Sequence, residues 1–151
     1  MIKIYQADAV FNDIVKGILN YPMMYNYDDP QNIWSEQWPE LRGLRMFIIE
    51  SVETMTGRTP CKFDGWCVTT INSNTHLLKH NHTKHADIVA NYYVINDNPV
   101  GEGDIIVYHP DGEMTSFHPE QGSLLLFPGS WDHRVTPYTG MRLSIATNIR
   151  L

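Results

Sequence analysis

The chain has 151 residues, of which 42% are hydrophobic and 19% are charged, and its formal net charge is −6. This length fits one domain with its own core and leaves no room for a second catalytic domain, while the composition excludes a disordered chain. We expect no nucleic-acid binding, because attraction to a phosphate backbone requires a basic surface.

The amino-terminal stretch, MIKIYQADAVFNDIV, lacks the long apolar region of a signal peptide. No apolar run in the chain approaches the roughly 20 residues that a membrane span requires. Cys61 and Cys67 are too few for a zinc knuckle, and we expect them to be reduced thiols. These features predict a cytoplasmic protein that does not bind membranes.

The first part of the chain shows sequence patterns typical of helices. Apolar residues recur at helical spacing over residues 8–20. A second helix is predicted over residues 39–57, where Pro39 suits the first turn and Gly57 a carboxy-terminal cap. We therefore expect residues 1–60 to form a helical part of a single domain that spans residues 1–151.

From residue 61 onward the chain consists of short strand-like segments separated by turns rich in Gly, Pro, Asn and Asp. The predicted strands read GWCVTTIN, THLLKHNH, DIVANYYVI, DIIVYH, MTSFH, SLLLFP, HRVTP and RLSIATNI. About eight short strands at this spacing are typical of a sandwich or barrel, with the helices packed on its outside. The fold class is therefore α+β, mainly β.

One stretch, HNHTKHAD, concentrates metal-ligating side chains at His80, His82, His85 and Asp87. Both His80-Asn81-His82 and His85-Ala86-Asp87 have the shape of a ligand pair, and spacing alone does not choose between them. In the predicted strand pattern, His80 and His82 end one strand, His85 lies in a turn and Asp87 begins the next strand. A carboxylate is nevertheless a common metal ligand, so both pairs stay open at this point.

A second group of polar residues lies near the carboxyl end, where His133 follows the turn PGSWD and Arg142 comes nine positions later. Side chains alternate along a strand, so Arg142 and Ser144 share one face, while Leu143 lies on the other. An arginine inside a barrel is costly unless an anion meets it, and a guanidinium beside a hydroxyl suits a carboxylate. This pattern predicts a carboxylate site at Arg142 and Ser144.

Together these motifs resemble the Fe(II)/2-oxoglutarate-dependent oxygenases, and more closely the short prolyl-hydroxylase-like oxygenases of bacteria and their phages. The matching pieces are GW at 65–66, HNH at 80–82, NYYV at 91–94 and the block GSLLLFPGSWDHRVTPYTGMRLSIATN at 122–148. The resemblance implies a double-stranded β-helix (jelly roll, cupin-like) core over residues 61–151. It also implies Fe(II) as cofactor, 2-oxoglutarate as co-substrate and the host cytoplasm as location if the gene is phage-borne.

In the family, a pair of ligands from one strand and a distal histidine hold the iron, usually as His, Asp and His. The resemblance and the strand pattern here favour His80, His82 and His133, with His85 and Asp87 as the alternative first pair. Arg142 and Ser144 would then hold the far carboxylate of 2-oxoglutarate.

The expected activity is hydroxylation of a small-molecule or peptide substrate, a prolyl side chain being one candidate, with molecular oxygen consumed and succinate and CO2 released. The alternative is a cupin-like metal-binding module, or an inactive oxygenase relative, that binds a small ligand without redox turnover. The sequence leaves the oligomeric state open.

Overall fold

The computed structural model of the chain describes residues 1–7, 32–35, 39–70 and 78–151, so the helix expected at 8–20 lies outside the described residues. Within the described part, strands dominate, as the sequence predicts. In chain order the elements are β1 (Lys3–Gln6), η1 (Ile33–Ser35), α2 (Pro39–Thr56), β2 (Lys62–Thr70), β3 (Ile88–Asn96), β4 (Ile105–Tyr108), β5 (Met114–Phe117), β6 (Ser123–Pro128), β7 (His133–Val135) and β8 (Arg142–Arg150).

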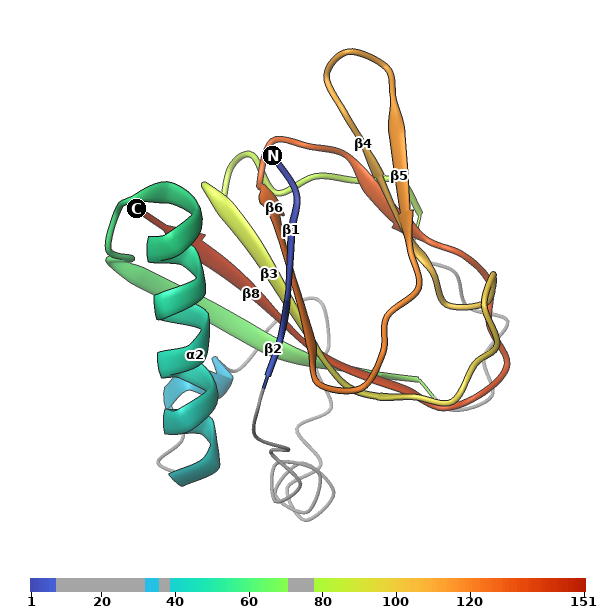
Figure 1. Ribbon diagram of the computed structural model, residues 1–151, viewed down its shortest axis with the longest axis horizontal. Coiled ribbons are helices and arrows are strands. Elements are labelled where there is room, and N and C mark those ends of the chain that lie inside the picture. The colour runs from blue at the N-terminus through green and yellow to red at the C-terminus, as the bar shows by residue number, and fades with distance from the viewer. Residues whose placement is uncertain (8–31, 36–38, 71–77) are drawn as a thin grey trace.

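The strands form two antiparallel sheets (Figure 1). The larger sheet has the order β1-β6-β3-β8-β2, and the smaller has the order β5-β4-β7. In the larger sheet, strands distant in sequence become neighbours, because β8 pairs with both β2 and β3 along nearly its whole length. Strand β8 therefore lies between β3 and β2, both of which come much earlier in the chain.

Helix α2 packs on one face of the larger sheet. Its buried residues Leu41, Leu44, Ile48 and Val52 recur every three or four positions and join sheet residues in one apolar cluster. Each fully buried Leu or Ile contributes about 1.5–3 kcal/mol relative to an exposed one. The helix ends at Thr56 and is followed by Gly57, whose positive φ of 69° suits a residue without a Cβ.

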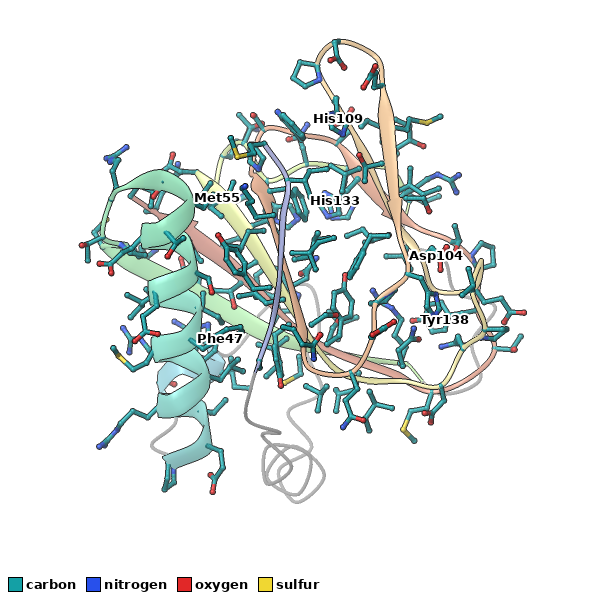
Figure 2. The ribbon with its side chains drawn as sticks, viewed as in Figure 1. Phe47, Met55, Asp104, His109, His133 and Tyr138 are labelled. Carbon is teal, nitrogen blue, oxygen red and sulfur yellow. The ribbon has the colours of Figure 1, made fainter. Side chains whose placement is uncertain are left out.

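The smaller sheet packs on the other face of the larger one. Val89 and Tyr93 of β3 and Phe127 of β6 belong to an apolar cluster that also contains Ile105 and Val107 of β4. Figure 2 shows Phe47 and Met55 of α2 on one side of the larger sheet and His133 on the other. Alternation along each central strand thus supplies one face to the helix and one to the smaller sheet.

Two expectations about local structure are wrong. Residues 3–6 form strand β1, which pairs with β6 at the sheet edge, so residues 1–60 are not wholly helical. The described part of the expected strand THLLKHNH forms no regular strand either, since His80 makes an isolated bridge to His133. A single bridge between two residues does not make a regular strand.

The cysteines are both free, with Cys61 exposed and Cys67 buried. Burial raises the pKa of the Cys67 thiol to about 12. Among the described residues, no helix has the length and apolar character needed to cross a membrane.

Candidate metal centre

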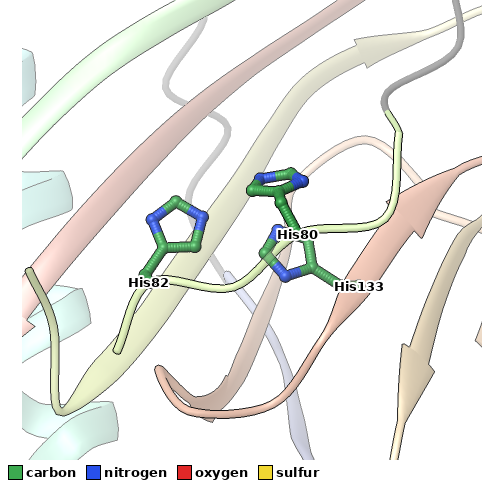
Figure 3. Close-up of side chains that lie close together, drawn as sticks. All are labelled: His80, His82 and His133. Atoms are coloured by element: carbon green, nitrogen blue, oxygen red, sulfur yellow. The ribbon is translucent and has the colours of Figure 1, made fainter. Parts of the chain in front are cut away.

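His80 and His133 are brought together by their backbones. The His80 N–H donates to the His133 carbonyl at 3.0 Å, and the His133 N–H donates to the His80 carbonyl at 2.8 Å. Residues that exchange both hydrogen bonds in an antiparallel bridge carry their side chains on the same side. The two imidazole centroids consequently lie 4.3 Å apart (Figure 3).

His82 completes the group. Its backbone N–H donates to the Gly129 carbonyl at 2.8 Å, which holds it against the turn that leads into β7. Its ring stacks on His133 at a centroid distance of 5.1 Å, and Trp66 of β2 lies on it at 6.1 Å. The ligand nitrogens of His80, His82 and His133 all lie within 4.8 Å of one another (Figure 3).

Gly129 permits this arrangement because it has no side chain. A Cβ at this position would meet the Ala86 carbonyl oxygen at 2.2 Å, well inside van der Waals contact. The Gly129 N–H also donates to the Asp87 carbonyl at 2.8 Å. The glycine thereby fastens both ends of the 82–87 segment to the end of β6.

The alternative pair points elsewhere. His85 is exposed in the turn after His82, and Asp87 is exposed as well. The Asp87 carboxylate accepts hydrogen bonds from the Leu151 N–H at 3.0 Å and from Arg150 Nη1 at 3.2 Å. These two donors, the Leu151 backbone first, lower the pKa of Asp87. Neither His85 nor Asp87 belongs to the group of facing nitrogens.

Polar residues next to His80 and His133 in the sequence connect the two segments by side-chain contacts. Asn81 Nδ2 donates to one oxygen of Asp132 at 2.8 Å, and Lys79 Nζ lies 3.3 Å from the other. Asp132 precedes His133, while Lys79 and Asn81 flank His80, so the contacts link the two segments that carry these ligand candidates.

Burial keeps two of the imidazoles neutral. Burial first, and the neighbouring His80 second, lower the pKa of His133 to about 3 and that of His82 to about 4. His80 Nδ1 lies 2.8 Å from the Leu78 carbonyl, so this nitrogen carries the proton and leaves Nε2 free to bind a metal. Neutral imidazole is the form that ligates metals.

Arg142 and Ser144 lie on one face of β8, and both are buried, with Arg142 only 4% exposed. The guanidinium carbon lies 5.2 Å from the Tyr93 ring centroid and 5.7 Å from that of Tyr138. Arg142 Nε has no hydrogen-bond partner, and no carboxylate in the described part of the chain forms an ion pair with it. A buried cation that no described carboxylate neutralises is a candidate for anion binding.

Other residues of the site were not assigned a role from the sequence. Asn148 lies on the same β8 face as Arg142, its Oδ1 is buried without a partner, and its side chain neighbours His82. Strand alternation from Arg142 could have placed Asn148 on this face. The contact of Trp66 with His82 depends on the pairing of β2 with β8, which a single sequence does not reveal.

No protein-family model matches the chain, and no curated protein matches it. Solved structures do match it. A prolyl-4-hydroxylase from Pseudomonas putida superposes with a TM-score of 0.75 at 15% identity, over 99% of this chain and 86% of that one. A prolyl hydroxylase from Trichoplax adhaerens, in complex with a hypoxia inducible factor oxygen degradation domain peptide fragment, gives 0.74 at 14% identity over 98% and 82%.

A further match is HygX from Streptomyces hygroscopicus, a structure with nickel and 2-oxoglutarate bound. Its TM-score is 0.74 at 9% identity, over 98% of this chain and 81% of that one. At such identities the likeness establishes a shared fold.

Proposed function

We propose that this chain, which has the fold of the prolyl hydroxylases just described, is an Fe(II)- and 2-oxoglutarate-dependent dioxygenase with a double-stranded β-helix core. In this proposal, two antiparallel sheets enclose a metal bound by His80, His82 and His133. The co-substrate lies between the metal and Arg142, and an unidentified substrate is hydroxylated as succinate and CO2 leave.

The observation that carries the proposal is the buried Arg142, with which none of the described carboxylates forms an ion pair. A structural metal site would explain three facing histidines, but it gives no reason to bury a guanidinium at 4% exposure with no ion pair to a carboxylate of the described ranges. A dicarboxylate accounts for both features, because one carboxylate can reach the metal while the other meets Arg142 and the Ser144 hydroxyl. Ser144 pairs with Tyr93 across the strands, beside the guanidinium.

The histidines fit the proposed metal. Three imidazole nitrogens within 4.8 Å of one another could hold a metal from one side and would leave room for further ligands, as non-haem iron oxygenases require. Fe(II), when bound, would supply the oxidising chemistry, in which oxygen is reduced as 2-oxoglutarate is converted to succinate and CO2.

The chain's own residues position and shield the reacting groups. Phe127 packs edge-on against His133 at a centroid distance of 4.9 Å, and Val89 lies in the same apolar cluster. These apolar neighbours limit the access of water to His133, which strengthens electrostatic interactions on that side of the site. Arg142 and Ser144 fix one end of the co-substrate, so that its other end is directed at the histidines.

The proposed substrate is a peptide, with a prolyl side chain as first candidate. Three of the structural neighbours are prolyl hydroxylases, one of them solved with a peptide fragment. Other neighbours with the same fold are an epimerase and a carbocyclase, both α-ketoglutarate dependent, so the fold alone does not define the substrate.

The first experiment adds Fe(II) and 2-oxoglutarate to the metal-free protein under anaerobic conditions and records the visible spectrum. A charge-transfer band is expected for the wild type, with no band for His133→Ala and a weaker band for Arg142→Ala. His85→Ala serves as control and should retain the band. A wild-type protein that binds Fe(II) and gives no band contradicts the proposal.

The second experiment measures oxygen uptake and succinate release. Coupled formation of succinate supports the oxygenase. Metal and 2-oxoglutarate binding without either product would instead favour a binding module of cupin type.

A further inference from the structure

Among the residues that the structure describes, the group of facing side chains contains three histidines and no carboxylate. Resting on the proposed metal site, we infer that His82 determines metal selection. It stands where an acidic ligand would complete a two-histidine site, and it makes the centre select metals that favour nitrogen and discriminate against Mn(II).

The described carboxylates near the histidines are all held elsewhere. Asp87 is bound by Arg150 and the Leu151 N–H, and Asp132 by Asn81 and Lys79. Asp64, the cross-strand partner of Asn148, lies 2.8 Å from Lys62 Nζ and is 44% exposed. None of the three is available to face the imidazoles without breaking these contacts.

His82 itself is fixed in the facing position. Its backbone is held by Gly129, and its ring lies between His133 and Trp66. Side-chain rearrangement is therefore restricted, so the ligand set is determined by which residue occupies position 82.

A ligand group made of the three described histidines alone has two chemical consequences. Imidazole suits Fe, Ni, Cu and Zn, whereas carboxylate and water suit Mn and Mg, so three imidazoles widen the affinity gap between Ni(II) and Mn(II). Three neutral ligands also leave the full double positive charge on the metal. An anionic co-ligand is then attracted more strongly than it would be to a centre that already carries a bound carboxylate.

The experiment compares the wild type with His82→Asp, and uses His85→Asp as a matched control in the exposed turn. Dissociation constants for Mn(II), Co(II) and Ni(II) are measured on each metal-free protein by competition with a chromophoric chelator. The visible spectrum of the Co(II) form reports the ligand set. His82→Glu, whose longer side chain spans more of the space left by imidazole, is measured in parallel, so that misfolding of one variant does not end the comparison.

The ratio of Ni(II) affinity to Mn(II) affinity should fall by about tenfold or more in His82→Asp or His82→Glu, and stay unchanged in His85→Asp. In the Co(II) form, the dissociation constant of 2-oxoglutarate should rise in the position-82 variants. Variants that bind metal with the wild-type ratio and the wild-type Co(II) spectrum overturn the inference, as does a wild type that binds none of these metals.

The outcome is separable from that of the proposed function. An unchanged metal ratio together with an intact Fe(II)/2-oxoglutarate band overturns the role of His82 and leaves the oxygenase. A changed ratio without any 2-oxoglutarate binding to the wild type overturns the oxygenase and leaves the metal selection.

Discussion

Replacing Arg142 should weaken ligand binding but increase the stability of the ligand-free protein. Arg142→Met should weaken 2-oxoglutarate binding by about 2–5 kcal/mol, because one partner of a buried charge pair is lost. The ligand-free protein should become more stable, since the variant removes a buried cation whose Nε has no partner. Calorimetric titration and urea unfolding measure the two effects.

Arg134→Met is the matched control for this variant, because Arg134 Nε donates to the Tyr108 hydroxyl instead. It should leave 2-oxoglutarate affinity unchanged. Equal losses of affinity in the two variants would remove the special role of Arg142.

The lowered pKa of His133 should make the stability of the metal-free protein depend on pH. Its pKa is about 3 in the folded protein against 6.5 for an unperturbed histidine, so the unfolded chain binds the extra proton first. Stability is therefore full above about pH 6.5 and falls as the pH drops below this value. Between pH 6.5 and about pH 5, His133 alone should cost about 2 kcal/mol.

Urea unfolding of the chelator-treated protein near neutral pH and at about pH 5 measures this slope. His133→Leu should show a shallower dependence, and His85→Leu should keep the wild-type dependence. Identical slopes for wild type and His133→Leu would mean that the imidazole is not held neutral by burial.

At the scale of elements, Gly129 connects the end of β6 with the 82–87 segment. Gly129→Ala places a methyl group 2.2 Å from the Ala86 carbonyl oxygen and should separate the two backbones. We expect a loss of stability of about 1–3 kcal/mol and weaker metal binding, because the His82 N–H is bonded to the Gly129 carbonyl. Ser130→Ala, an exposed change in the same turn, is the control for unfolding and metal titration.

A second element-scale prediction concerns the loop before β8. The Asn98 side chain accepts the Gly140 N–H at 2.7 Å and donates to Asn96 Oδ1 at 2.8 Å, and Asn96 pairs with Arg142. Asn98→Ala should thus displace Arg142 and weaken 2-oxoglutarate binding several-fold, while metal affinity stays constant.

Asp132→Ala should weaken metal binding and leave the contact of 2-oxoglutarate with Arg142 unchanged, because Asp132 links the segments that carry His80 and His133. Titrating both variants with Ni(II) and then with 2-oxoglutarate separates the two roles. A loss of metal affinity in Asn98→Ala would show that the loop network supports the whole sheet rather than Arg142.

The sequence allowed the strands from β3 to β8 to be predicted closely, because their apolar runs are bounded by turn residues. It did not reveal β1, whose four residues KIYQ are mostly exposed and carry no strong periodic signal. Strand alternation correctly placed Arg142 and Ser144 on a common face. The literal motif at His85 and Asp87 was ambiguous, because the contacts of Asp87 with Arg150 and Leu151 join residues more than sixty positions apart.

At the scale of the whole molecule, the candidate ligands come from several strands and connecting segments, so binding should stabilise the global fold. A ligand at 100 times its dissociation constant adds about 2.7 kcal/mol, which for a domain of this size is a rise in Tm of about 5–10 °C. Ni(II) should raise the Tm, and 2-oxoglutarate should raise it further. His133→Ala should show neither shift in the same thermal scans. A wild-type Tm that does not change when Ni(II) is added would contradict the metal site.

The contacts of Asp87 have a consequence for metal binding. Its carboxylate binds Arg150 and the Leu151 N–H, and Arg150 Nη2 also donates to the Lys84 carbonyl at 2.6 Å. Residues 150–151 therefore brace the turn that follows His82. A sample in which Arg150 is replaced should therefore lose part of the support of this turn and bind metal more weakly at the proposed site.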